Sequence, residues 1–247
     1  MKIVAKTRDH EVIDRINVAL DATNYADPNS FEMRWIKREC ERVREVEPAL
    51  GWSLLACYNS MLGDGDEVRR CFQASWRLEK SSCAVANYYA NLSNLGYFSE
   101  AHQFFTDYGR PEGGMLSQLA EKTTGSFQRL VSYFDEAEAK GFVTVDATQV
   151  DYRTAARILS QHGISDVEIA LHMDAAGAVL RRHRMFYYGD IQIQVSDVEG
   201  VFTGITCVFR MRLSPDEVFD LNVELSKNER ELQVQKSPIF DVMFLPA

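Results

Sequence analysis

The 247-residue sequence predicts a two-part α+β protein. An all-α helical-repeat solenoid is expected over residues 1–163, followed by a small antiparallel β-rich domain, a meander or a sandwich, over residues 164–247. Two observations predict this division. Apolar residues recur at helical spacing after three glycines in the first part, and they alternate with polar residues in much of the second.

The helical part contains an internal repeat that begins at Gly63, Gly96 and Gly125, with a period of 33 and then 29 residues. Five residues after each glycine stands an aliphatic residue, and nine residues after it stands a phenylalanine (Val68, Ala101 and Leu130; Phe72, Phe105 and Phe134). These offsets share one face of a helix. The glycine supplies the left-handed conformation that ends the preceding helix. Each unit is therefore predicted to be a helix, a tight turn and a second helix.

Helices are also expected on both sides of these units. Apolar spacing predicts one helix near residues 12–20 and another over 31–46, ended by Pro48. Residues 115–124 would form the short first helix of the third unit. A helix that starts near Thr148 and stops at Gly163 would cap the stack.

The repeat resembles the tetratricopeptide-repeat family over about residues 49–140. The resemblance depends on the following residues: Trp52, Leu55, Ala56, Gly63, Val68 and Phe72, then Gly96, Phe98, Ala101 and Phe105, then Gly125, Phe127, Leu130 and Phe134. It implies a curved stack whose first helices line a groove for a peptide or a partner helix. By position, the implied lining is small and polar: Ser53, Cys57, Ser60, Asn87, Ala90, Ser93 and Asn94.

Beyond Gly163, alternation of apolar and polar residues predicts short strands, among them 191–195, 201–213, 219–225 and 239–245. Turns are expected at residues 199–200 and 227–228. Two alternatives stay open. Residues 214–217, Ser-Pro-Asp-Glu, could instead start a helix, and residues 174–184 could form a hairpin or a helical turn.

The formal net charge of −9 argues against a nucleic-acid binder, because such proteins usually neutralise phosphates with a basic face. One dense basic run, with Arg181, Arg182 and Arg184, is a candidate patch for phosphate or an acidic partner. A solvated segment explains the run as well. Association with nucleic acid through these arginines therefore remains an alternative.

No catalytic motif occurs: GxxxxGK[ST], GxGxxG, HExxH and GxSxG are all absent from the sequence. Neither a catalytic residue nor a cofactor or metal is therefore expected. The alternative is an enzyme with its site where the two parts meet, using His172, Asp174 or His183. Acidic residues 64, 66 and 67 are expected to favour a helix N-terminus instead of performing catalysis.

The five cysteines include no CxxC pair, which favours reduced side chains and a cytoplasmic location. The sequence has no run of eighteen consecutive apolar residues, so no membrane span is predicted. The sequence thus predicts a non-enzymatic interaction scaffold, an adaptor, chaperone-like or regulatory protein that binds another protein or peptide. A short array of helical repeats would also expose apolar surfaces at its two ends, so association into a homo-oligomer is a further expectation.

Overall fold

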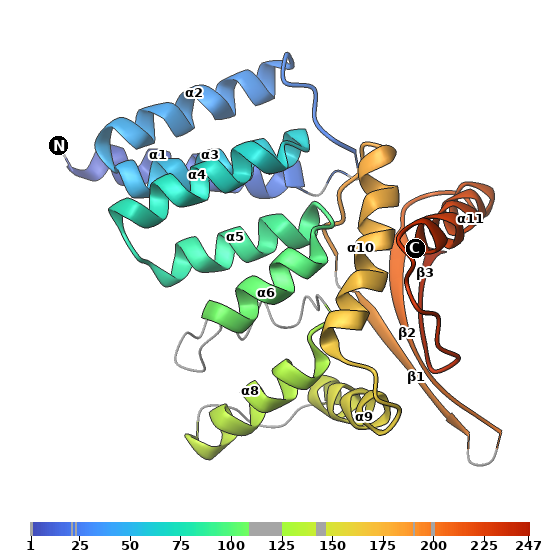
Figure 1. Cartoon of the computed structure of the whole chain (residues 1–247). Helices are drawn as coiled ribbons and strands as arrows, with labels where there is room; N and C mark the ends of the chain where they lie inside the picture. The colour runs from blue at the N-terminus through green and yellow to red at the C-terminus, as the bar shows by residue number, and fades with distance from the viewer. Residues whose placement is uncertain are drawn as a thin grey trace. The chain divides into compact units, whose positions relative to one another are not determined.

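A computed structural model describes residues 2–20, 22, 24–108, 125–141, 147–189, 191–198 and 201–247 (Figure 1). The described residues are mostly helical, with ten helices and a small three-stranded sheet near the C-terminus. None of these helices has the length and apolar character needed to cross a membrane. The expected helix over 115–124 and the expected turn at 199–200 lie outside the described residues.

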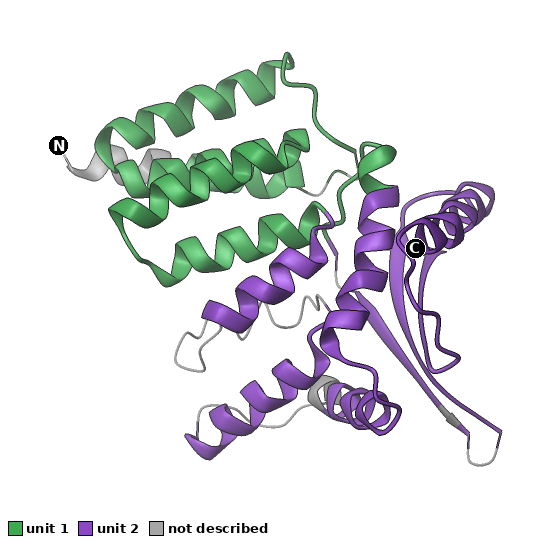
Figure 2. Ribbon diagram, viewed as in Figure 1, with its two compact units in different colours: residues 1–95, 180–188 green, residues 96–179, 189–247 purple. Residues whose placement is uncertain are grey.

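The chain divides into two compact units (Figure 2). Unit 1 comprises Met1–Leu95 and Leu180–Tyr188, and unit 2 comprises Gly96–Val179 and Gly189–Ala247. The division falls between Leu95 and Gly96, within the second expected hairpin. The domain boundary expected after residue 163 stays a prediction.

Unit 1 contains five helices: α1 (Lys2–Leu20), α2 (Phe31–Val46), α3 (Pro48–Leu62), α4 (Gly65–Leu78) and α5 (Ser82–Asn94). Helix α3 is central, because it contacts α1, α2, α4 and α5. Its apolar side chains Leu54, Leu55 and Met61 are buried in a core that continues into α1 and α2. The helices expected near residues 12–20 and over 31–46 are confirmed as α1 and α2.

Local sequence signals set the ends of these helices. The side chains of Ser30, Asp64 and Ser81 accept hydrogen bonds from backbone N–H groups in the first turns of α2, α4 and α5. Helix α3 ends at Gly63, whose φ of 80° is left-handed as predicted. A Cβ at Gly63 would lie 2.0 Å from the Tyr25 ring, so this turn is also closely packed.

Unit 2 contains helices α6 (Phe98–Tyr108), α8 (Phe127–Ala139), α9 (Ala147–Gln161) and α11 (Pro215–Glu231), and most of α10 (Asp166–Arg182). The predicted left-handed glycines are confirmed at Gly96 (φ 73°) and Gly125 (φ 79°). Of the two alternatives for residues 174–184, a hairpin is wrong, since α10 continues to Arg182.

Helix α10 packs against the turns at Gly96 and Gly125. A Cβ at Gly177 would lie 2.0 Å from the Gly96 carbonyl oxygen, so only glycine permits this approach. Eight residues earlier on α10, Ile169 stands 2.5 Å from the Cβ position of Gly125. Eight residues of α-helix advance by about 12 Å, so one helix can meet two successive turns.

The sheet consists of β1 (Gln192–Val198), β2 (Phe202–Met211) and β3 (Phe240–Pro246) in the order β1-β2-β3. These strands coincide with three of the predicted strands. The expectation of an antiparallel domain is only partly right, because β1 and β2 are antiparallel while β2 and β3 are parallel. A parallel neighbour requires a crossover connection, and α11 supplies it.

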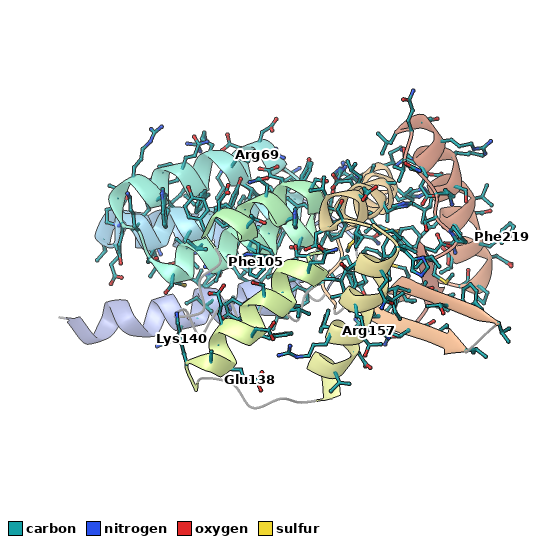
Figure 3. The ribbon with its side chains drawn as sticks, turned by 60° about the horizontal axis from the view of Figure 1, so that its bottom comes forward. Arg69, Phe105, Glu138, Lys140, Arg157 and Phe219 are labelled. Carbon is teal, nitrogen blue, oxygen red and sulfur yellow. The ribbon has the colours of Figure 1, made fainter. Side chains whose placement is uncertain are left out.

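The strand predicted over 219–225 and the turn at 227–228 are wrong, because both segments lie in α11. Ser214 and Glu217 form a reciprocal capping box, and Pro215 stands in the first turn. Val218, Leu221 and Leu225 are buried at helical spacing, whereas Phe219 is 67% exposed. Figure 3 shows Phe219 projecting outward from α11. The alternation of apolar residues in this segment therefore coincides with a helical face.

Candidate partner-binding site

The seven side chains implied as the lining of a groove lie on α3 and α5 of unit 1. Proline is compatible with the first turn of α3, and the Ser81 hydroxyl accepts a hydrogen bond from Ala84 N at the start of α5. Both helices carry their large apolar residues toward the core. Small polar residues remain where the two helices face each other.

Two polar contacts join α3 and α5. The Asn87 Nδ2 donates to Ser53 Oγ at 3.1 Å, and the Asn91 Nδ2 donates to Cys57 Sγ at 3.7 Å. Both contacts join residues 34 apart in the chain. One turn forward on α3 therefore corresponds to one turn forward on α5, so the two helices are parallel and in register.

Exposure divides the implied lining into two groups. Ser53, Ser60, Ser93 and Asn94 are buried, and the Ser93 hydroxyl donates to Tyr89 O within α5. Cys57, Asn87 and Ala90 are half-buried, and the neighbouring Cys83 is exposed. We call these four reachable residues (Cys57, Cys83, Asn87 and Ala90) the α3–α5 strip.

The chemistry of the α3–α5 strip is neutral. It combines one amide, one methyl group and two thiols, with no charged side chain. Burial raises the pKa of Cys57 to about 11, so its sulfur is a thiol at neutral pH and a poor nucleophile. The strip can therefore contribute hydrogen bonds and close packing, but not ionic attraction.

The three arginines of the candidate basic patch are all in unit 1. Arg181 is half-buried, and its Nη1 donates to Leu95 O at 3.2 Å, beyond the end of α5. The Arg184 guanidinium lies 5.8 Å from the centre of the Tyr25 ring. Arg182 is exposed in the last turn of α10. Arg181 and Arg184 thus have structural contacts within unit 1.

The acidic residues near Gly63 lie where a helix begins, as predicted. Asp64 caps α4, since its Oδ1 accepts a hydrogen bond from Glu67 N at 3.0 Å. Asp66 pairs with Arg69, and Glu67 pairs with Arg70. The hydrogen bond from Arg70 lowers the pKa of Glu67, which keeps this carboxylate ionised.

Unit 2 contains a buried ionisable cluster between α10 and α11 that the sequence did not indicate. His172 Nδ1 lies 3.1 Å from Glu229 Oε1, and its Nε2 lies 3.2 Å from Gln235 O. His172 and Glu229 are 3% and 1% exposed. Lys236 Nζ lies 2.5 Å from the second oxygen of Glu229.

The Glu229 carboxylate is kept ionised in this cluster. Burial alone would raise its pKa, but hydrogen bonds from His172 and Lys236 outweigh burial and lower it. Both ring nitrogens of His172 face acceptors, a carboxylate and a carbonyl.

A cavity of about 240 Å³ lies beside this cluster, between the start of β2 and the segment that leads into β3. Its ionisable lining residues are Lys236 and Asp241. Lys236 already pairs with Glu229, and Asp241 Oδ1 accepts a hydrogen bond from Val242 N at 2.9 Å. The cavity therefore does not gather ionisable groups around one reacting atom.

The alternative metal or catalytic residues His172 and Asp174 point to different partners. Asp174 Oδ1 accepts a hydrogen bond from Ser99 N in the first turn of α6, at 3.1 Å. Asp166 does the same for α8, because its two oxygens accept from Gln128 N and Arg129 N at 3.0 and 2.9 Å. Within the described residues, no three His, Cys, Asp or Glu side chains are grouped to hold a metal ion.

Comparison with known proteins adds no relative. No protein-family model, no curated protein and no solved structure matches the chain. The functional interpretation therefore depends on the residues and their geometry alone.

Proposed function

We propose that the protein is a cytoplasmic interaction scaffold without chemistry of its own, and that it binds an extended peptide or a partner helix along the α3–α5 strip. The observation that carries this proposal is the parallel, in-register pairing of α3 with α5. That pairing leaves a neutral polar strip at the surface of unit 1.

A stacked helical repeat, as the tetratricopeptide-like pattern implies, is the architecture that we propose for this region. Two features support it. Parallel first helices, related by a constant offset of 34 residues at two positions, are expected when one hairpin repeats along a stack. Helix α3 also contacts the helices before and after it, α1, α2, α4 and α5, as an internal unit of a stack must.

The strip suits a polypeptide ligand. The Asn87 Nδ2 donates to Ser53 and to Cys83, and the Oδ1 of the same amide can accept a hydrogen bond from a peptide N–H of an extended chain. Ala90, one turn away from Ala86 and Asn87, lets another backbone approach closely. Since no charge lies in the strip, we expect binding to depend little on salt.

The test uses the double variant Asn87→Arg and Ala90→Arg in the full chain. Partners captured from extract of the native cells are identified, purified and titrated against both proteins. We expect the double variant to lose binding more than tenfold, because two long charged side chains block the strip. It should stay folded, with a melting temperature lowered only by the loss of the Asn87–Ser53 hydrogen bond. Ser93 is not suitable for such a change, since it is buried.

The matched control is Gln73→Arg, which adds the same side chain at an exposed position of α4. A photo-crosslinking residue at position 90, and separately at position 73, gives a second readout. Crosslinks to the partner are expected at 90 only. Equal binding by all variants would contradict the α3–α5 strip as the site. A partner found to be nucleic acid, with binding that falls steeply with salt, would favour the arginine run instead.

A further inference from the structure

Residues 180–188 belong to unit 1, although they follow helices of unit 2 in the chain (Figure 2). Helix α10 ends within this stretch, and we call residues 184–188, which come after it, the strap. Phe186 of the strap is 2% exposed and lies in a hydrophobic core whose other members come from residues 12–71. A side chain from a distant part of the sequence thus completes the core of the first helices.

Backbone hydrogen bonds hold the strap to two other segments of unit 1. Tyr25 N donates to Arg184 O at 2.8 Å, and these two segments form a single antiparallel bridge. Tyr187 N donates to Asn94 O at 2.9 Å, at the last residue of α5. Such main-chain pairing on both sides of a buried side chain is how proteins bind extended peptides by strand addition.

One side chain of the strap makes the contact selective. The Phe186 ring stacks on the Tyr25 ring, with ring centres 6.4 Å apart and an angle of 16° between the planes. Tyr25 itself is fixed by its close packing on the Gly63 turn. The backbone bonds accept any sequence, whereas the position of Phe186 requires a large apolar ring. An aromatic anchor in a well-packed position is typical of a recognised peptide.

The strap begins in an unfavourable backbone conformation. Arg184 has a φ of 55°, in the left-handed region that favours glycine. This conformation ends α10, because Arg184 N donates to Arg181 O at 3.1 Å and Met185 N donates to Leu180 O at 2.9 Å. An arginine in this conformation opposes the bound position of the strap. Backbone strain of this kind occurs at clamps and switch regions.

We propose that the strap is an intramolecular ligand, and that the place it fills is a second peptide-binding site of unit 1. The ligand that replaces it is an extended peptide with an aromatic residue between backbone groups that pair with Tyr25 and Asn94. Because the two aromatic rings would need the same position in the core, the strap and the peptide exclude each other. The strap is therefore an autoinhibitory contact.

The tether determines how this exclusion can be tested. A segment tethered in the same chain competes at an effective concentration of about 1 mM. A free peptide of the same sequence therefore cannot displace the natural strap at micromolar concentration. Truncating Phe186 weakens the strap but leaves the rest of the site in place, so the peptide should then bind.

The test measures binding of a fluorescent synthetic peptide, residues 182–189 of this sequence, to the full chain by fluorescence anisotropy. The Phe186→Ala variant is expected to bind it more than about tenfold more tightly than the natural chain does, because a buried phenylalanine contributes most of such a contact. The same peptide with Phe186→Ala should not bind. Phe219→Ala, at an exposed position of α11, is the matched control and should bind as weakly as the natural chain.

The melting temperature gives a second readout. The peptide should raise the melting temperature of the Phe186→Ala variant by several degrees and leave that of the natural chain unchanged, because a ligand stabilises only a protein that it binds. Phe186→Leu keeps an apolar side chain and should show the same effects, but smaller. It provides the test if Phe186→Ala does not fold.

Two results would overturn the proposal. Variants at Phe186 that neither bind the peptide nor gain stability from it would show that this ring serves core packing alone. Equal binding by the natural chain and by all variants would place the peptide on another surface. Asn87→Arg and Ala90→Arg, combined with Phe186→Ala, should leave peptide binding intact, so failure at the α3–α5 strip and failure at the strap are distinguishable.

Discussion

The two units differ in how some of their helices are capped and in the contacts that join them, although α11 of unit 2 also has a local cap at Ser214. In unit 1, α2, α4 and α5 are capped by Ser30, Asp64 and Ser81, each next to the helix that it caps. In unit 2, α6 and α8 are capped from a distance, by Asp174 and Asp166 of α10. The joining contacts differ too: a neutral amide–hydroxyl contact joins α3 to α5, whereas a buried contact between His172 and the Glu229 carboxylate joins α10 to α11.

This difference has a physical consequence. A local cap stabilises the helix that carries it, so its loss is felt mainly there. A distant cap also fixes the position of the helix that supplies it. Removing Asp166 should therefore loosen α8 and α10 together, and unit 2 should be the more sensitive unit to single polar substitutions.

The largest effect is expected from Asp166→Ala. This change leaves two N–H groups of α8 without their buried acceptor, at a cost of about 3 kcal/mol in the free energy of unfolding. Asp64→Ala, in unit 1, removes a local and more exposed cap and should cost about 1 kcal/mol. Urea denaturation compares the two variants.

Amide hydrogen exchange locates each effect. Faster exchange at Gln128 and Arg129 is expected for Asp166→Ala, and faster exchange at Glu67 for Asp64→Ala. Equal losses of stability in the two variants would remove the distinction between local and distant capping.

An intermediate effect is expected at Glu229, and it depends on pH. The folded pKa of Glu229 lies below its ordinary value of 4.5, so its ionised form stabilises the fold above pH 4.5. This stabilisation is lost as the pH falls through the lowered folded value. Glu229→Gln should therefore cost about 2 kcal/mol at pH 7 and progressively less in acid.

Urea denaturation between pH 7 and pH 3 measures this slope. The Asn87→Ala variant in unit 1 is the control, because its contact with Ser53 carries no charge and its cost should not change with pH. A cost at Glu229 that stays constant over this range would show that the cluster acts by packing and not by charge.

The same contrast explains what the sequence could predict. The capping signals of unit 1 and its left-handed Gly63 act over a few residues, so their spacing indicates α3, the turn and α4. The caps on α6 and α8 join residues separated by 75 and by 37 or 38 positions. A spacing rule that covers one turn of helix cannot find them.

In the C-terminal part, apolar alternation alone was ambiguous. It predicted the three strands but also a strand over 219–225, where Val218, Leu221 and Leu225 form the buried side of α11. The capping box at Ser214 and Glu217 was the better signal, because it specifies where a helix starts. The helix made β3 parallel to β2, which no local pattern in the strands could indicate.

At the candidate site, the position of a residue along its helix indicates that it faces the neighbouring helix. It does not indicate whether the side chain is exposed or buried. Seven residues were implied on α3 and α5, and four of them are buried. Asn91, which pairs with Cys57, was not among them. Its offset of 34 residues from Cys57, the same as that between Ser53 and Asn87, is a signal that could have found it.

The smallest expected effect tests the contact that supports the stacked repeat. Ser53→Ala and Asn87→Ala should each cost about 1 kcal/mol, and the double variant should cost less than their sum, because each removes the same hydrogen bond. A coupling of about 0.5 kcal/mol or more in this cycle would support direct pairing of α3 with α5. Ser53→Ala combined with Gln73→Ala, a residue of α4 outside this contact, should be additive. Additivity in both cycles would mean that the hydrogen bond between Ser53 and Asn87 contributes nothing to the free energy of unfolding. The packing of α3 against α5 would then depend on apolar contacts alone.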